Sequence, residues 1–223
     1  MNVKKLIQRI ALIALLLVSL ENIQAQQPFY NDVQALKRKD SAAFPPPNAI
    51  LFTGSSSFTK WTAVQGAFPN YKIINRAFGG STLPDLIRYA DEIILPYQPR
   101  QVVIYCGDND LASSDSVTPQ IVLNRFEQLF HLIRSRLPQT YILYVSIKPS
   151  PSREKLMPKM VEANTLIKNF LKKQRRTSFA DVYSKMLLAD GKPDPSLFIE
   201  DNLHMNAKGY AIWQKALKPY LKK

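Results

Sequence analysis

Two polar segments far apart in the sequence contain a hydroxyl group, a carboxylate and an imidazole, which together can perform nucleophilic catalysis. Three hydroxyls follow an apolar run in the segment Ser55-Ser56-Ser57, and Asp201 stands three residues before His204. A carboxylate at that spacing can orient an imidazole and hold its tautomer, and the imidazole can then take the proton of a serine. The pattern predicts a serine nucleophile, a histidine base and an orienting aspartate.

The choice of the base is nearly forced, because the chain has only two histidines. His131 falls on a predicted helix, on the face opposite its apolar stripe, so we expect it to be exposed. A serine between a strand and a helix also lies near the positive end of the helix dipole, which favours developing negative charge. From this segment alone, simple capping of the helix by Ser55 or Ser56 is an equally good interpretation.

Two further loops contain groups that can stabilise an oxyanion. Gly79 and Gly80 follow the second predicted strand, where paired glycines allow a tight turn that aims a backbone N–H at a ligand. Asn109, in the segment 107–110 after the third strand, offers an amide donor. Each loop alone is an ordinary turn. Four of the seven glycines lie in such strand-end loops, however, and generic packing does not explain that concentration.

The elements that must position these residues alternate regularly along the chain. Short apolar runs bounded by turn residues predict five strands, at residues 49–53, 72–75, 101–106, 140–147 and 178–182. Amphipathic stretches predict helices at residues 83–95, 119–137, 155–173 and 207–217, and a charged stretch at 31–39 predicts a further short helix. This alternation predicts an α/β fold with a parallel sheet covered on both faces. No repeat or second composition zone indicates a second domain.

The first 25 residues have the pattern of a secretory signal peptide. Three basic residues precede an apolar run at 10–20, and a short polar stretch ends at Ala25. The apolar run is about half of the roughly 20 residues that span a bilayer. We therefore expect a signal peptide at 1–25, one domain at 26–223, no membrane span in the mature chain, and export to a periplasm or to the outside of the cell. An uncleaved N-terminal anchor is the alternative.

Composition excludes several other classes of protein. Cys106 is the only cysteine, so no intramolecular disulfide can form, and its apolar surroundings indicate a buried side chain. Two distant histidines and one cysteine make no metal-ligand cluster, and we expect no metal and no cofactor. The net charge of +13 is compatible with anionic polymers or lipid head groups. The export signal and the lack of interleaved aromatics argue against nucleic acid. The oligomeric state is not fixed by the sequence.

With these motifs in place, nearly all of the mature chain resembles the SGNH hydrolase superfamily, the GDSL-type lipases and esterases. Gly54-Ser55-Ser56 matches the first block, normally Gly-Asp-Ser, with Ser56 as the nucleophile. The other three blocks, in family order, fall on Gly80, on the segment 107–110 and on the segment 201–204. The chain departs from the pattern at Ser55, where the family usually has a supporting Asp. Ser55 and Ser57 stay minor candidates for the nucleophile.

The resemblance implies a three-layer α/β/α sandwich with a five-stranded parallel sheet of flavodoxin-like topology. It implies ester hydrolysis by Ser56, His204 and Asp201, with an oxyanion hole made by the backbone N–H groups of Ser56 and Gly80 and by the Asn109 amide. The substrate is a small-molecule or polysaccharide acyl ester. Because no apolar lid is visible, we favour O-deacetylation of carbohydrate. A lysophospholipase, an acyltransferase with the same triad, and a non-catalytic carbohydrate-binding domain are the alternatives.

Overall fold

A five-stranded parallel sheet forms the centre of the protein. The computed structural model describes residues 27–223, so the expected signal peptide at 1–25 lies outside the described residues. Residues 31–223 form one compact unit. The sheet has the order β2-β1-β3-β4-β5 and contains β1 (Ile50–Gly54), β2 (Ile73–Asn75), β3 (Gln101–Tyr105), β4 (Tyr141–Val145) and β5 (Thr177–Ala180). This is the flavodoxin-like strand order, and it confirms the predicted fold class.

The strand register brings the predicted loops to one edge of the sheet. Ile50 of β1 pairs with Gln101 of β3, and Gln101 pairs with Tyr141 of β4. The carboxyl ends of all five strands therefore face the same way. The strand order reverses between β1 and β3, and ligands of open α/β sheets bind at such a point. The loops after β1 and β3 are those that carry Ser56 and Asn109.

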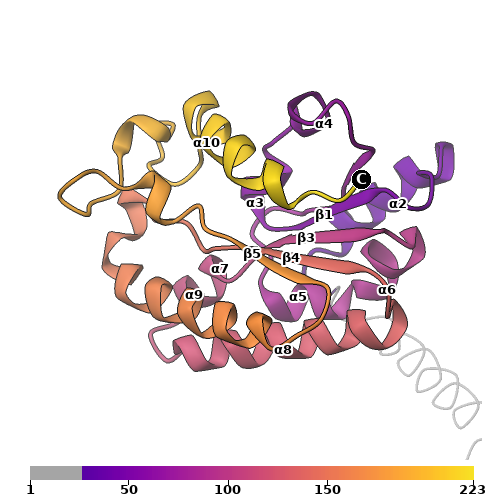
Figure 1. The fold of residues 1–223 in the computed structure, drawn as a ribbon, viewed down its shortest axis with the longest axis horizontal. Coiled ribbons are helices and arrows are strands. Elements are labelled where there is room, and N and C mark those ends of the chain that lie inside the picture. The colour runs from indigo at the N-terminus through magenta and orange to yellow at the C-terminus, as the bar shows by residue number, and fades with distance from the viewer. Residues whose placement is uncertain (1–26) are drawn as a thin grey trace, which may run out of the picture. The chain divides into compact units, whose positions relative to one another are not determined.

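Helices cover both faces of the sheet, as Figure 1 shows. The lower layer in that view contains α5 (Leu83–Arg88), α6 (Ala90–Ile93), α8 (Pro119–Arg136) and α9 (Met157–Lys172). The upper layer contains α3 (Ser56–Thr59), α4 (Val64–Ala67) and α10 (Ala207–Leu217). The remaining α-helices of the described chain are α2 (Tyr30–Ala42) and α7 (Asp108–Ser113). The three-layer α/β/α arrangement agrees with the prediction.

Some helices differ from the sequence-based prediction. The predicted helix 83–95 is broken at Tyr89, which leaves helical geometry with φ −101° and ψ 10° and ends α5. The predicted helix 155–173 starts as a 3₁₀ turn over Pro151–Leu156, and α9 begins only at Met157, with Pro158 in its first turn. The short helices α3, α4 and α7 were not predicted, because four to six residues show no helical period.

The aromatic residues near the motifs belong to the core. The rings of Tyr105 and Trp213 have centroids 4.8 Å apart, and those of Phe52 and Phe58 are 4.9 Å apart. Phe58, Trp61, Phe78 and Tyr105 are all buried, so they are not walls of an open subsite. Cys106 is also fully buried, and burial raises the pKa of its thiol well above the ordinary value. His131 is exposed, as expected.

Gly54 ends β1 in a conformation that only glycine tolerates. Its φ is +135°, and a Cβ there would lie 1.9 Å from the carbonyl oxygen of Tyr105. That oxygen accepts a hydrogen bond from the Ser55 N–H at 3.0 Å. A side chain at position 54 would therefore push β1 and β3 apart just before the nucleophile loop.

We expect Gly54→Ala to lower the free energy of unfolding by about 3 kcal/mol or more, because it combines a forbidden backbone angle with a backbone clash. Urea unfolding followed by circular dichroism measures this. Gly66→Ala in α4 is the matched control, since a Cβ there meets nothing within 4 Å. Equal unfolding midpoints for the two variants would contradict the expectation.

The described chain contains neither a membrane-spanning helix nor a cluster of metal-ligating side chains. Within residues 27–223 no helix is long and apolar enough to cross a membrane. The same residues contain no group of three or more His, Cys, Asp or Glu side chains that could hold a metal ion.

Candidate active site

The loop after β1 separates three neighbouring serines by their exposure. Ser55 and Ser57 are buried, while Ser56, the first residue of α3, is partly exposed. Ser55 stands at the N-cap position of α3, yet its side chain makes no capping hydrogen bond. Its Oγ instead accepts a hydrogen bond from Asn109 Nδ2 at 2.7 Å. The interpretation of Ser55 as a simple cap is therefore wrong, and Ser56 is the serine that a substrate can reach.

His204 lies between Ser56 and Asp201 at hydrogen-bonding distance from both. Its Nε2 is 2.9 Å from Ser56 Oγ, and its Nδ1 is 2.5 Å from Asp201 Oδ2. Ser56 and His204 are 148 residues apart in the sequence, so only the fold brings them together. In this arrangement the imidazole can take the serine proton while the carboxylate stabilises the imidazolium.

The Asp201 carboxylate is held in its charged form. Partial loss of solvent raises its pKa, but hydrogen bonds from the His204 ring and from the backbone N–H groups of His204 and Leu203 outweigh that effect. The two backbone N–H groups donate to Asp201 Oδ1 at 2.8 and 2.9 Å. The pKa of Asp201 therefore lies well below its usual value. The carboxylate is ionised at neutral pH and can accept the Nδ1 proton.

A short hairpin presents the histidine. An antiparallel bridge joins Phe198 to Met205, and the Ile199 N–H donates to the carbonyl oxygen of His204 at 2.9 Å. Asn202 turns the chain with φ +55°, a left-handed conformation that asparagine tolerates better than most residues. Asn206 then caps α10 by accepting hydrogen bonds from the next backbone N–H groups. The hairpin and the cap fix the position of His204 from both sides.

The loops after β1, β2 and β3 meet close to Ser56. Asn109 Nδ2 donates to the Ser81 carbonyl oxygen at 3.0 Å, and Ser81 Oγ donates to the Gly54 carbonyl oxygen at 2.9 Å. A Cβ on Gly79 would lie 3.9 Å from the Cβ of Ser56. Among the residues that the structure describes, no acceptor is hydrogen-bonded to the backbone N–H of Ser56 or of Gly80. Both N–H groups can therefore receive a ligand oxygen.

Asp110, in the same segment as Asn109, takes no part in this arrangement. It is fully buried and binds the Leu83 N–H at 3.0 Å and Arg125 at 2.8 Å. Burial raises the pKa of its carboxyl, and the Leu83 N–H and Arg125 oppose that rise. Asp110 therefore ties α7 to α5 and α8, which fixes the helix that carries Asn109.

The sequence analysis missed two cations beside the site. Lys148 is 1% exposed, and its Nζ donates to the Leu203 carbonyl oxygen at 2.8 Å. Arg153 Nη2 donates to Asn109 Oδ1 at 2.9 Å, while its Nη1 lies 3.0 Å from Asp108 Oδ2. Both follow β4, whose carboxyl end reaches the edge where Ser56 lies. Their position after a predicted strand was the only sequence signal that could have identified these two residues. The loop 148–153 contains no glycine, histidine or acidic residue that would have marked it as part of a site.

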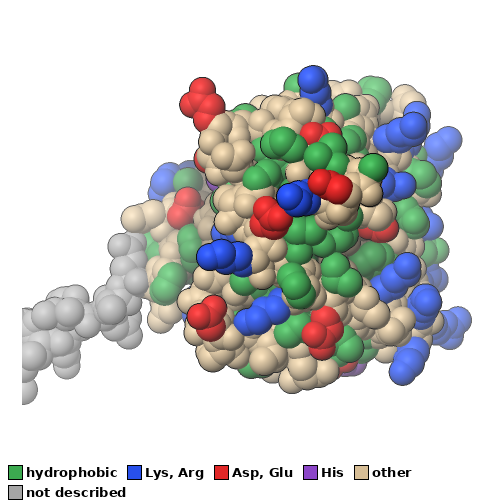
Figure 2. All heavy atoms as spheres, turned by 90° about the vertical axis from the view of Figure 1, so that its left-hand side faces the viewer, with side chains coloured by type: hydrophobic (Ala, Val, Ile, Leu, Met, Phe, Trp, Pro, Cys, Tyr) green, Lys and Arg blue, Asp and Glu red, His purple; other side chains and the backbone are tan. Residues whose placement is uncertain are grey.

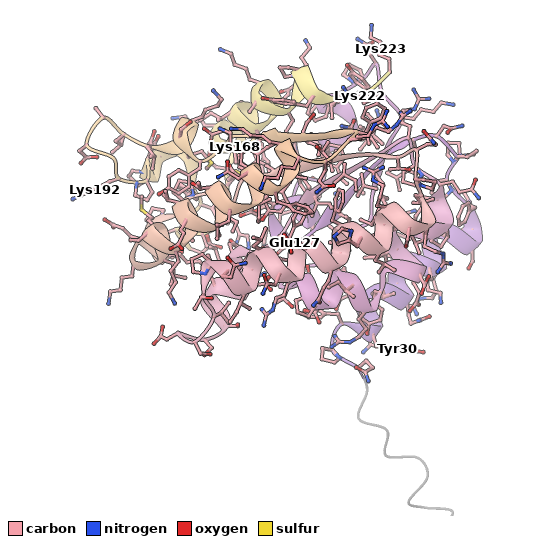
Figure 3. All side chains as sticks on the ribbon, turned by 60° about the horizontal axis from the view of Figure 1, so that its bottom comes forward. Tyr30, Glu127, Lys168, Lys192, Lys222 and Lys223 are labelled. Carbon is pink, nitrogen blue, oxygen red and sulfur yellow. The ribbon has the colours of Figure 1, made fainter. Side chains whose placement is uncertain are left out.

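Hollows occur at both ends of the sheet. One of about 970 Å³ is lined by Leu111, Asp115, Arg153 and Leu156 and by their neighbours, so it borders the residue that holds Asn109. Another of about 660 Å³ includes Arg100, Tyr141 and Lys222 and lies at the amino ends of the strands, far from Ser56. Figure 3 shows Lys192 at the left edge of the molecule, well away from Lys222 and Lys223 at the upper right. We therefore associate the first hollow with the site.

The surface around the carboxyl ends of the strands is mixed in charge. Figure 2 views the molecule from that side and shows acidic, basic and apolar side chains together on this face. Basic side chains gather instead along one margin of the view. The high net charge of the chain is therefore not concentrated at the site.

Comparison with known proteins gives one family and many similar folds. The model of the GDSL-like lipase/acylhydrolase family matches residues 41–212. No curated protein matches the chain. A Streptococcus pneumonia protein, provisionally described as a platelet activating factor, is 23% identical, with a TM-score of 0.75, over 94% of this chain and 99% of its own.

Two further solved structures have the same architecture. A GDSL-like lipase from Bacteroides thetaiotaomicron is 19% identical, with a TM-score of 0.71, over 84% of this chain and 96% of its own. An acetylxylan esterase from Geobacillus stearothermophilus is 15% identical, with a TM-score of 0.61, over 80% of this chain and 96% of its own. At these identities the likeness shows a shared fold.

Proposed function

The chain belongs to the GDSL-like lipase/acylhydrolase family and is a carboxylic ester hydrolase, and we propose that it works as a serine esterase through Ser56, His204 and Asp201. One observation carries the proposal. The His204 ring lies 2.9 Å from Ser56 Oγ on one side and 2.5 Å from Asp201 Oδ2 on the other. No other serine in the β1–α3 loop is both exposed and within reach of an imidazole.

In the first half of the reaction, Ser56 Oγ attacks the ester carbonyl carbon while its proton passes to His204 Nε2. Asp201 stabilises the imidazolium that forms. The tetrahedral oxyanion is held by the N–H groups of Ser56 and Gly80, each such donor being worth about 3 kcal/mol of barrier. His204 then protonates the leaving alcohol oxygen, the C–O bond breaks, and Ser56 carries the acyl group.

In the second half, His204 Nε2 takes a proton from water, and the resulting hydroxide attacks the acyl carbonyl. The tetrahedral intermediate collapses, the proton returns to Ser56 Oγ, and the carboxylic acid leaves. If an alcohol replaces water in this half, the same residues perform acyl transfer. Every step uses the described side chains and backbone.

Asn109 is the third proposed oxyanion donor. Both of its Nδ2 hydrogens are engaged in the structure, one by Ser55 Oγ and one by the Ser81 carbonyl oxygen. To donate to a substrate oxygen, Asn109 must therefore break one of these two hydrogen bonds. We expect it to break the bond to Ser55 Oγ, because the Ser55 hydroxyl can rotate and donate to another acceptor. This gives the serine at the family's usual Asp position a direct contact with the oxyanion donor.

For the substrate, we propose short acyl groups on carbohydrate. The hollow beside Arg153 is lined by charged and polar side chains as well as by apolar ones, which suits a hydroxyl-rich alcohol portion. The structurally similar protein from Geobacillus stearothermophilus is, by its name, an esterase that acts on acetylxylan, which is an acetylated carbohydrate. The enzyme would meet this substrate after export, with the domain 26–223 as the mature chain.

The test is hydrolysis of p-nitrophenyl acetate, butyrate and octanoate, and of acetylated xylooligosaccharides, by the chain from residue 26 onward. We expect kcat/KM to fall from acetate to octanoate and acetate to be released from the oligosaccharides. Ser56→Ala, run in parallel, measures the background. A preference for octanoate would replace the carbohydrate substrate by a lipid one. No activity above the Ser56→Ala background on any ester would count against the serine esterase itself.

A further inference from the structure

One loop after β4 reaches both halves of the proposed active site. Segment 148–153 contacts the histidine hairpin through Lys148, and through a hydrogen bond of 3.1 Å from the Ser152 N–H to the Asn202 carbonyl oxygen. At its far end Arg153 contacts Asn109. These contacts join residues that are 44 to 55 positions apart in the sequence. A loop whose role was only to connect β4 to α9 would not require Lys148 and Arg153 where they contact the hairpin and Asn109.

Lys148 is an unusual residue for a core. Its side chain is 1% exposed, its Nζ lies 5.4 Å from the centre of the Phe198 ring, and its Nζ donates a hydrogen bond to the Leu203 carbonyl oxygen. Phe198 and Leu203 lie on the two sides of the hairpin that presents His204, Phe198 in its single bridge to Met205 and Leu203 just before His204. The ammonium therefore contacts both sides of that hairpin, one by a hydrogen bond and the other by a cation–π interaction.

The cost of burying this charge suggests a role beyond stability. Burial lowers the pKa of Lys148 to about 8; the carboxylates Asp108 and Asp201 oppose that effect, and Arg153 adds to it. An isolated buried ammonium destabilises a fold, and an apolar side chain of similar shape is often at least as stable. A methionine at position 148 would fill the same space without a charge. The charge is therefore better explained by its effect on its neighbours.

We propose that Lys148 and Arg153 are positioning residues for the reaction, Lys148 acting through Leu203 on His204 and Arg153 acting through Asn109 on the oxyanion. This inference rests on the proposed function of His204 and Asn109. Lys148 fixes the backbone that carries the imidazole, because its ammonium holds the carbonyl oxygen of Leu203, the residue just before His204. Arg153 holds Asn109 Oδ1, which fixes the direction of the amide N–H groups and makes them better donors.

The histidine half can be tested without any substrate. The chain has only two histidines, so His131→Asn leaves His204 as the only imidazole to follow by NMR. In that background we expect Lys148→Met to displace and broaden the ring resonances of His204, including that of the Nδ1 proton shared with Asp201, because the hairpin that carries the ring loses its hydrogen bond to Lys148. The other groups around Lys148 are Asp108, Asp201, Arg153 and the Tyr105 hydroxyl, and all are retained.

Two comparisons separate position from simple packing. Lys148→Arg keeps a donor for the Leu203 carbonyl oxygen, so its His204 resonances should stay close to those of the parent. Lys159→Met is the matched control, since Lys159 Nζ also holds loop carbonyls, those of Asp115 and Val117, but belongs to α9. It should leave the His204 resonances unchanged. Unchanged His204 resonances in Lys148→Met would overturn the proposed role of Lys148.

Kinetics test both cations on the best ester. We expect Lys148→Met and Arg153→Gln each to lower kcat by about 10- to 100-fold with KM changed less than about threefold, because they act through groups that are needed in the transition state. Arg153→Lys should not recover kcat, since one ammonium cannot bind Asp108 and Asn109 as a planar guanidinium does. Arg134→Gln, which removes a guanidinium that holds other loop carbonyls, should leave kcat unchanged.

The outcomes are distinguishable from failure of the esterase itself. A lower melting temperature in parallel with the loss of kcat, together with unchanged His204 resonances, would reduce both residues to structural supports. Wild-type activity no higher than that of Ser56→Ala, with the His204 resonances still displaced in Lys148→Met, would reject the proposed function and keep the effect of Lys148 on His204. Recovery of kcat by Arg153→Lys would overturn the role of Arg153 as a hold on both Asp108 and Asn109.

Discussion

Ser56→Ala is expected to lower kcat by about 10⁴ to 10⁶-fold with a far smaller change in KM. The substitution removes the only atom that forms the acyl-enzyme, while the N–H groups that bind the substrate carbonyl remain. Because Ser56 is partly exposed, loss of its hydroxyl should leave the melting temperature nearly unchanged. Steady-state hydrolysis of p-nitrophenyl acetate, with an active-site titration of the wild type, measures the loss.

His204→Ala should be almost as damaging, and the double variant Ser56→Ala/His204→Ala should be no worse than either single one. The two residues act as a unit joined by the hydrogen bond of 2.9 Å, so their losses do not add. Ser57→Ala is the control for the identity of the nucleophile, because Ser57 is a buried neighbour. We expect it to stay within about tenfold of the wild type. Multiplicative losses, or a larger loss in Ser57→Ala, would contradict the assignment.

Asp201→Asn is expected to lower kcat by about 10⁴-fold at neutral pH without removing the loop. Asparagine can still accept the backbone N–H groups of Leu203 and His204 that now bind Asp201 Oδ1. Its amide would donate to Nδ1 of the imidazole, which then carries its proton on Nε2 and cannot take one from Ser56. The expected loss of kcat therefore comes from the wrong tautomer of His204 and from the missing negative charge. The pH dependence of kcat/KM and the melting temperature together measure it.

The pH dependence gives a second check on Asp201. Its pKa is depressed in the folded chain, so the stabilisation from its ionised form is present at neutral pH and is lost only as the pH falls through that low value. Between pH 8 and pH 5 the Asp201 carboxylate should therefore stay ionised, and a change of wild-type kcat/KM in that range should not come from this group. Asp194→Asn is the control, because Asp194 also accepts a nearby backbone N–H, that of Ser196, without an imidazole partner. It should behave as the wild type.

The sequence by itself determined the architecture. Apolar runs at a spacing that leaves room for one helix between them favour parallel pairing, and all five strands occur within two residues of the expected bounds. The order of the four motif blocks also led to the prediction of Ser56, Gly80, Asn109, Asp201 and His204 as site residues. A prediction of this kind can be made from sequence, because glycine at strand ends and a carboxylate three residues before a histidine act within a few residues of each other.

Only the tertiary structure decided which groups meet across the sheet. Exposure distinguished Ser56 from its two neighbours, and the spatial meeting of the β1 and β3 loops gave Ser55 Oγ its contact with Asn109. Lys148 and Arg153 could not be found from local patterns, since their partners are 44 to 55 residues away. Hydrogen bonds and charge effects depend on distance in space, and a single sequence records distance along the chain alone.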